Sequence, residues 1–318
     1  MNIAKKQILM KNLLEINNVI KNYGDFRALN DVSIHIPKGS VYGLLGPNGA
    51  GKTSLIRIIN QITMADSGSI FLDGAPLAPK HTADIGYLPE ERGLYKSMKV
   101  GEQALYLAQL KGLSKSEAKK RLKYWFEKFD ISAWWGKKIE ELSKGMAQKV
   151  QFIVTVMHNP KLLIFDEPFS GFDPINAQLI AKEILQLRDE GATIIFSTHR
   201  MESVEEMCDD IALINKSNKI LDGKLSDIKR EFRTNTFQVG LNTTNQKEVE
   251  EQLKANFKVF PADFKLLGKE LTMNVKLGEK DSANDLLSFL TNRGEVQHFV
   301  ELIPSANDIF IQAVNKNN

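Results

Sequence analysis

The segment GPNGAGKT, residues 46–53, contains the residue types that bind a triphosphate. It fits the pattern G-x-x-x-x-G-K-[ST], and it lies between an apolar strand-like run and a helix-like run, the context that this motif requires. Successive backbone N–H groups of such a loop wrap phosphate oxygens, the lysine reaches the outer phosphates, and the threonine hydroxyl can ligate Mg²⁺. The residues predicted to bind the nucleotide here are Gly46, Pro47, Asn48, Gly49, Ala50, Gly51, Lys52, Thr53 and Ser54.

Two carboxylates and a histidine stand at the ends of two further apolar runs. The run 160–168 contains Asp166 and Glu167, and the run 191–199 ends in His199. Short, nearly all-apolar runs predict strands that are buried on both faces of a parallel sheet. At a sheet edge next to the phosphate loop, Asp166 would hold the Mg²⁺ shell and Glu167 would face the attacking water. His199 could contact the γ-phosphate, although a histidine at a strand end can also be purely structural. The predicted catalytic residues are Glu167, His199 and Lys52.

A second predicted anion site is the helix start in ELSKGMAQKVQF, residues 141–152. Ser143 can cap this helix, and apolar residues follow at helical spacing. The first N–H groups of a helix and its dipole favour a negative charge, so the Ser143 hydroxyl and the Gly145 N–H are predicted to hold an anion. The residues alone leave open which anion this is.

The phosphate loop by itself does not distinguish GTPases, kinases and ATPases. A GTPase needs an Asn-Lys-x-Asp guanine reader, and the nearest string, NKSN at 215–218, lacks the aspartate. Guanine specificity is therefore unsupported by the sequence.

With these residues in order, the chain resembles the ATP-binding subunits of ATP-binding cassette (ABC) transporters over roughly residues 13–225. The residues EERGLY, LSKGM and the C-terminal appendage are most similar to the bacterial sodium-efflux (NatA-like) and drug-export group. The matching motifs are an adenine-stacking loop with Tyr23 in KNYGDFRAL, the Walker A loop, the Q-loop IGYLPEERGLY, the signature LSKGMAQ, Walker B in LLIFDE, the D-loop SGFDP and the switch residue His199.

The resemblance implies an ATPase that uses ATP and Mg²⁺ and powers a membrane transporter, with export the expected direction. It implies head-to-tail pairing, as a homodimer or with a related ATPase subunit, in which Ser143 and Gly145 clasp the ATP of the opposite subunit. Polytopic permease subunits are the implied membrane partners. A non-transport cassette ATPase and a nucleotide sensor are the alternatives. The implied metal ligands are Thr53, Glu90 and Asp166.

Three positions depart from the family pattern. Lys144 and Met146 replace the first Gly and the Gln of Leu-Ser-Gly-Gly-Gln, and Glu90 replaces the usual Q-loop glutamine. Lys144 would add a cation near an anion, provided that its φ/ψ suits a residue with a Cβ atom. The Glu90 carboxylate ligates Mg²⁺ at least as well as an amide but brings negative charge towards the triphosphate.

The predicted fold is α/β: a P-loop NTPase cassette over residues 13–230, followed by an accessory domain over 231–318. The cassette is expected to have a mixed central sheet, a flanking antiparallel β subdomain and a helical subdomain at about 97–158. The accessory domain reads as strand-helix-strand-strand-helix-strand, which predicts a small ferredoxin-like α+β domain.

Composition limits the remaining possibilities. The formal net charge of +3 is too small to indicate a nucleic-acid partner. One cysteine, Cys208, excludes an internal disulfide and fits a reducing compartment. The apolar runs fall short of the roughly 18–20 residues that span a bilayer, and Lys11 interrupts the N-terminal apolar stretch. We therefore expect a cytoplasmic protein, peripheral at the inner face of the cell membrane, whose membrane part is supplied by other subunits.

Overall fold

The computed structural model describes residues 11–91, 93–262, 270–278 and 280–317. The chain divides into two compact units, Met1–Leu225 with Ala313–Asn318, and Ser226–Gln312. The domain boundary predicted at 230/231 falls inside α7 (Leu225–Glu231) and remains a prediction about which segments fold independently.

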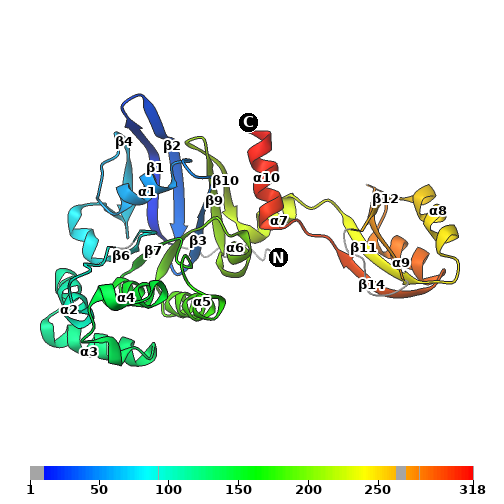
Figure 1. Ribbon diagram of the computed structural model, residues 1–318. Coiled ribbons are helices and arrows are strands. Elements are labelled where there is room, and N and C mark those ends of the chain that lie inside the picture. Colours follow the sequence, from blue (N-terminus) through cyan, green and yellow to red (C-terminus); the bar gives the residue numbers. More distant parts are fainter. Residues whose placement is uncertain (1–10, 92, 263–269, 279, 318) are drawn as a thin grey trace, which may run out of the picture. The chain divides into compact units, whose positions relative to one another are not determined.

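The centre of the first unit is a mixed sheet with strand order β10-β9-β3-β8-β7-β6 (Figure 1). Neighbours from β9 to β6 are parallel, and β10 is antiparallel to β9. The apolar runs form β3, β7 and β8, which are buried along their whole length, as expected for strands covered on both faces. The strands are β3 (Val41–Leu45), β6 (Ile85–Leu88), β7 (Leu162–Asp166), β8 (Thr193–Ser197), β9 (Asp210–Asn215) and β10 (Asn218–Lys224).

A second, antiparallel sheet has the order β2-β1-β4-β5, which confirms the predicted β subdomain. Its strands are β1 (Asn12–Tyr23), β2 (Phe26–Pro37), β4 (Ser67–Leu72) and β5 (Ala75–Pro76). Helix α1 (Lys52–Ile59) shares one apolar cluster with both sheets, through residues such as Leu14, Ile56 and Ile195. This shared core fixes the start of α1, and with it the phosphate loop, between the two sheets.

The helical subdomain consists of α2 (Val100–Leu110), α3 (Lys115–Lys128) and α4 (Lys144–Val156), with short 3₁₀ turns before α4. The three helices lie together at one end of the first unit (Figure 1). Trp125 of α3 packs edge-on against Phe152 of α4, and the Phe152 ring also stacks on Phe165 of β7 at 5.7 Å. Helix α5 (Pro174–Asp189) is joined to α3 by an ion pair of 2.5 Å between the Lys128 ammonium and the buried Glu183 carboxylate.

The second unit has a βαββαβ order and an antiparallel sheet ordered β12-β13-β11-β14. This order confirms the predicted ferredoxin-like domain. Its elements are β11 (Thr236–Asn242), α8 (Gln246–Asn256), β12 (Lys258–Pro261), β13 (Leu271–Lys276), α9 (Ala283–Thr291) and β14 (Glu295–Glu301). Residues 263–269, which lie between the second and third strands of the predicted order, are outside the described residues. Helix α10 (Ala306–Lys316) ends the chain, and α6 (Met201–Met207) precedes β9 in the first unit.

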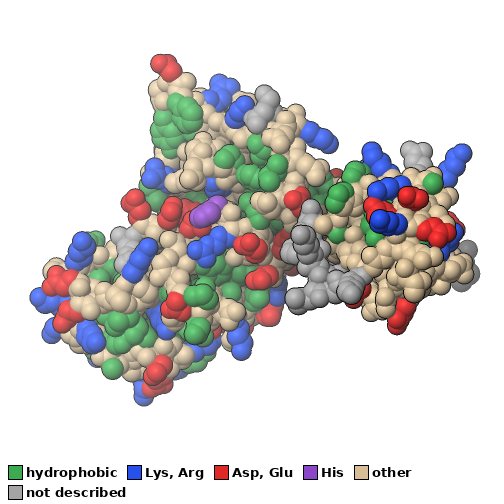
Figure 2. All heavy atoms as spheres, turned by 45° about the vertical axis from the view of Figure 1, so that its right-hand side comes forward, with side chains coloured by type: hydrophobic (Ala, Val, Ile, Leu, Met, Phe, Trp, Pro, Cys, Tyr) green, Lys and Arg blue, Asp and Glu red, His purple; other side chains and the backbone are tan. Residues whose placement is uncertain are grey.

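The helices within the described ranges are too short or too polar to cross a bilayer. On the face drawn in Figure 2, basic and acidic side chains are interspersed, in keeping with the small net charge.

Candidate nucleotide site

The phosphate loop connects β3 to α1, and two of its glycines are required by their surroundings. Gly46 has φ +148° and Gly51 has φ +118°, a region that side chains rarely adopt. A Cβ atom at Gly46 would lie 2.2 Å from the Ile214 carbonyl oxygen, and one at Gly51 would lie 2.3 Å from the Ala28 carbonyl oxygen. The loop is thus held between β9 and β2. Gly51 is also the N-cap of α1, and because glycine has no side chain it cannot cap the first turn, which suits a helix start that receives an anion.

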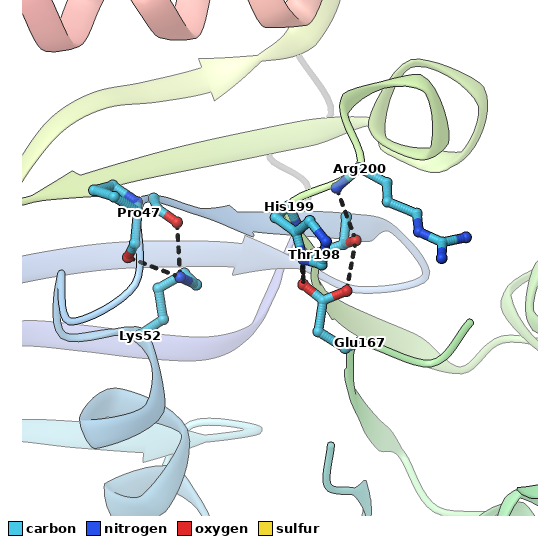
Figure 3. Close-up of polar contacts among 7 residues, drawn as sticks. Pro47, Lys52, Glu167, Thr198, His199 and Arg200 are labelled. Atoms are coloured by element: carbon cyan, nitrogen blue, oxygen red, sulfur yellow. Dashed lines mark hydrogen bonds and ion pairs between the residues drawn. The ribbon is translucent and has the colours of Figure 1, made fainter. Parts of the chain in front are cut away.

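Lys52 extends over this loop. Its ammonium donates to the carbonyl oxygens of Gly46 at 2.7 Å and Pro47 at 3.1 Å (Figure 3). Burial lowers the pKa of Lys52, and nearby carboxylates, Asp166 foremost among them, oppose that shift. The cation therefore lies among the loop carbonyls with acidic groups close by, as a phosphate-binding lysine must.

The carboxylates around Lys52 come from two neighbouring strands. Asp166 ends β7 and is only 8% exposed, and burial raises its pKa, with the charges of Glu90 and Glu167 adding to the shift. Glu90 follows β6 and is exposed. The carboxylates of Asp166, Glu167 and Glu90 therefore all lie close enough to the Lys52 ammonium to oppose the lowering of its pKa.

Glu167 follows directly after β7 in the left-handed region, with φ +50°. Its N–H donates to the Ser197 carbonyl oxygen at 2.8 Å, which ties it to the end of β8. One oxygen of its carboxylate accepts from the His199 N–H at 2.8 Å and lies 2.6 Å from His199 Nδ1 (Figure 3). The His199 side chain is 73% exposed, whereas that of Glu167 is 13% exposed, so the histidine covers a carboxylate set into the sheet edge.

Thr198 is a site residue that sequence reasoning missed. Its hydroxyl donates to the second carboxylate oxygen of Glu167 at 3.1 Å and accepts from the Arg200 N–H at 3.1 Å (Figure 3). The residue is buried. The sequence held one signal for this role: Thr198 stands between a buried apolar run and His199. Because adjacent parallel strands end at the same edge of a sheet, its hydroxyl could be expected near Glu167.

The predicted signature residues lie at the start of α4, as their spacing indicated. The Ser143 hydroxyl accepts from the Met146 N–H at 3.2 Å, so Ser143 is the N-cap. Lys144 is the first residue of α4 and lies outside the left-handed region. Its backbone conformation therefore suits a residue with a Cβ atom, as the replacement of the usual glycine requires. Its aliphatic stem lies over Gly171, where a Cβ atom would come within 2.4 Å of Lys144 Cε.

Tyr23 ends β1 at the turn of the β1–β2 hairpin. Tyr23 is 43% exposed, and the Lys21 ammonium lies 5.4 Å from the centre of its ring. An exposed aromatic ring of this kind can stack on a planar partner.

The predicted metal ligands are hard oxygen donors, the kind that Mg²⁺ prefers. Within the described ranges, three or more His, Cys, Asp or Glu side chains nowhere gather into a metal site. The predicted set is smaller, with two carboxylates (Asp166 and Glu90) and the Thr53 hydroxyl. This fits Mg²⁺, which is usually held by one or two carboxylates and completes its shell with phosphate oxygens and water.

Comparison with known protein families divides the chain at a similar place. A family described as "ABC transporter" matches residues 29–170, and one described as "ATP-binding protein DrrA1-3-like, C-terminal domain" matches residues 223–314. A third, described as "AAA domain, putative AbiEii toxin, Type IV TA system", matches residues 136–205, which begin before α4 and end within α6.

One relative is similar over almost its whole length. The "Uncharacterized ABC transporter ATP-binding protein YhaQ" of Bacillus subtilis (strain 168) is 41% identical over 305 residues, 95% of this chain and 98% of the relative. The chain belongs to the ATP-binding proteins of ABC transporters. It is therefore an ATPase subunit with the ABC cassette fold, and the resemblance inferred from the motifs is confirmed.

Other members of this family match over a smaller share of the chain. The "Linearmycin resistance ATP-binding protein LnrL" of B. subtilis (strain 168) is 36% identical over 68% of this chain and 70% of the relative. The "ABC transporter ATP-binding protein NatA" of the same organism is 36% identical over 65% of this chain and 86% of the relative. A solved "Structure of ATP binding subunit of ABC transporter" superposes with a TM-score of 0.65 and 31% identity over 69% of this chain and 93% of that chain.

Proposed function

We propose that this chain is the ATP-hydrolysing subunit of a bacterial ABC exporter and that it works in an ATP-sandwiched dimer. The observation that carries the hydrolytic part is the convergence of Glu167 and His199 at the sheet edge beside Lys52. Likeness to proteins named for linearmycin resistance and Nod factor export supports export as the direction.

In this proposal, the phosphate-loop N–H groups and Lys52 hold the triphosphate, and Tyr23 stacks on the adenine. Thr53, Asp166 and Glu90 hold Mg²⁺, which when bound neutralises charge on the phosphate oxygens. Burial of Asp166 raises its pKa, and the charges of Glu90 and Glu167 add to the shift. A divalent cation bound there would supply the counter-charge that favours the ionised carboxylate.

Glu167 is the proposed general base. Its carboxylate accepts a proton from the water that attacks the γ-phosphate. This transfer requires a free lone pair on one of the carboxylate oxygens to face that water. Thr198 and the His199 N–H hold the carboxylate at the sheet edge by donating to its two oxygens. The exposed His199 ring can turn from Glu167 to the γ-phosphate and stabilise its developing charge.

The start of α4 is the proposed contact with a neighbouring protomer. Ser143 is exposed, and the Gly145 N–H lies in the first turn of α4, where helix N–H groups and the dipole favour an anion. We assign these groups to the γ-phosphate of the ATP that the opposite protomer holds. The opposite protomer is a second copy of this chain or a related ATPase subunit.

The proposal also includes polytopic permease subunits and a location at the inner face of the cell membrane. The names of the relatives favour transport over the two alternatives, a non-transport cassette ATPase and a nucleotide sensor. Co-purification with a polytopic membrane protein would separate transport from both alternatives.

Replacing Glu167 by glutamine tests the hydrolytic assignment. We expect Glu167→Gln to bind ATP and to lower turnover by about 10²–10⁴-fold, because a lost general base typically costs that much. The variant should also accumulate as an ATP-bound dimer on size-exclusion chromatography. Glu117→Gln, at a half-buried position of α3 where the carboxylate pairs with Arg121, is the matched control and should keep normal turnover. Near-normal hydrolysis by Glu167→Gln would remove Glu167 from this role.

A further inference from the structure

The turn between β9 and β10 touches the phosphate loop and the antiparallel sheet at once. This turn is the NKSN segment, residues 215–218, whose ends pair across the hairpin as Asn215 with Asn218. The Ser217 N–H donates to the Ala50 carbonyl oxygen of the phosphate loop at 3.1 Å. The Ser217 carbonyl oxygen accepts from the Asn30 N–H of β2 at 2.8 Å, and its hydroxyl donates to the Arg27 carbonyl oxygen at 2.5 Å.

The two central residues of this turn, Lys216 and Ser217, adopt a left-handed backbone conformation that costs energy for a residue other than glycine or asparagine. Lys216 has φ +44° and Ser217 has φ +69°, the signs that a type I′ turn needs and that asparagine and glycine provide at little cost. Ser217 is 8% exposed. Non-glycine residues persist in this region only when their surroundings determine them, and such positions cluster at functional sites.

The contacts of Ser217 continue towards Tyr23. Arg27 Nε donates to the Asn22 side-chain oxygen at 3.2 Å, and Arg27 Nη1 donates to the Asn30 side-chain oxygen at 2.9 Å. Asn22 is the neighbour of Tyr23 at the end of β1, where Tyr23 pairs with Phe26 across the hairpin. A connected set of hydrogen bonds therefore joins the phosphate loop, through Ser217, to the hairpin that carries the aromatic ring.

We propose that Ser217 is a positioning residue that sets the Tyr23 hairpin relative to the phosphate loop. Its backbone N–H anchors the turn to the loop, and its carbonyl oxygen holds Asn30 of β2. Its hydroxyl holds Arg27, which directly follows the residue that pairs with Tyr23 at the tip of the β1–β2 hairpin. Removing only the hydroxyl therefore loosens the base-binding ring while the phosphate loop keeps its bond to the turn. The inference rests on the proposed role of Tyr23 in stacking on adenine.

The test compares a ligand that has an adenine with one that has only the phosphates. In the full chain, the dissociation constants of ADP and of inorganic pyrophosphate, each with Mg²⁺, are measured by calorimetry for the wild type and for Ser217→Ala. We expect Ser217→Ala to bind ADP about 3- to 10-fold more weakly, the range for one lost hydrogen bond, and to bind pyrophosphate normally. Equal losses for both ligands, or a loss for neither, would overturn the proposal.

Two further variants separate positioning from stability. Ser217→Gly also lacks the hydroxyl but relieves the left-handed backbone, so it should fold well and show the same loss for ADP alone. Ser40→Ala removes a hydroxyl that donates to the Pro37 carbonyl oxygen at 2.8 Å, before β3 and so at the opposite end of that strand from the phosphate loop. It should change thermal stability without changing the ratio of the two affinities.

A double-mutant cycle with Tyr23 completes the test. Tyr23→Ala should weaken ADP but not pyrophosphate, and Ser217→Ala should then have no further effect, because coupled residues are not additive. Full additivity would overturn the positioning role of Ser217 alone. If Tyr23→Ala leaves ADP binding unchanged, the stacking role itself fails, and the present inference fails with it.

Discussion

The phosphate loop and the start of α4 both place glycine at a helix start, but only the first is constrained by this chain. A Cβ atom at Gly51 would lie 2.3 Å from a backbone carbonyl oxygen, and φ at Gly51 is +118°. A Cβ atom at Gly145 would meet no described atom nearer than 3.8 Å, an ordinary contact, and Gly145 lies outside the left-handed region. Packing within the folded chain therefore requires glycine at position 51, whereas none of the described contacts requires glycine at position 145.

This difference favours a composite site. The conformation of the phosphate loop is fixed within one chain, because backbone carbonyls of β2 and β9 lie close to it on both sides. The signature residues present an exposed serine and a half-buried glycine with open space at its Cβ position. A second protomer that approaches α4 closely would supply the missing constraint.

The strongest test of this comparison uses mixed dimers. One protomer carries Ser143→Arg and the other carries Lys52→Ala, so both changes fall on the same composite site and the second site stays intact. We expect this dimer to retain hydrolysis, because the arginine obstructs only the partner's nucleotide. Placing both changes in one protomer, opposite a wild-type partner, should abolish hydrolysis because each site then has one defect.

These dimers are assembled from differently tagged chains, and their phosphate release is measured after purification. Activity in the second arrangement and none in the first would show that the signature and the phosphate loop act within one chain. Loss in both arrangements would show that the two sites are strictly coupled.

A pair of alanine variants tests the two glycines directly. Gly51→Ala should weaken ADP binding by about 30-fold, since a left-handed side chain and the contact with Ala28 together cost about 2 kcal/mol. Gly145→Ala should change ADP binding to the single chain by less than about twofold. It should nevertheless slow hydrolysis by the dimer, and full dimer activity would contradict the proposed contact.

The smallest expected effect concerns Lys144. Lys144→Gly restores the usual family residue and should lower the free energy of unfolding by up to about 1 kcal/mol, because glycine is a poor helix former and the stem over Gly171 is lost. Chemical denaturation measures this difference, with Lys149→Gly in the same helix as control. A change in single-chain nucleotide affinity would show that Lys144 acts on its own phosphate loop.

The motifs and the apolar runs predicted much of this molecule. Strands β3, β7 and β8 followed from short apolar segments, and the ferredoxin-like unit followed from the order of its elements. Glu167 and His199 were chosen because both follow buried strands, and parallel strands end at one edge. Those inferences depend on local pattern, which the sequence displays directly.

Contacts between distant residues could not be predicted in this way. The bonds of Ser217 join it to Ala50 and Arg27, which lie 167 and 190 positions earlier. Thr198 reaches Glu167 across 31 positions. Such pairings depend on how the strands are ordered and registered, and a single sequence does not reveal either. The conformation of Lys144 likewise follows from where α4 begins.

The backbone at Glu167 has a consequence for selection. A side chain at φ +50° costs roughly 1–2 kcal/mol relative to glycine, and asparagine also tolerates this region better than glutamate does. Heat resistance alone would therefore favour Glu167→Gly or Glu167→Asn, either of which removes the proposed base. A laboratory evolution of this protein that screens only for survival of the fold should enrich inactive chains at this position, while retention of glutamate would report on pressure for turnover.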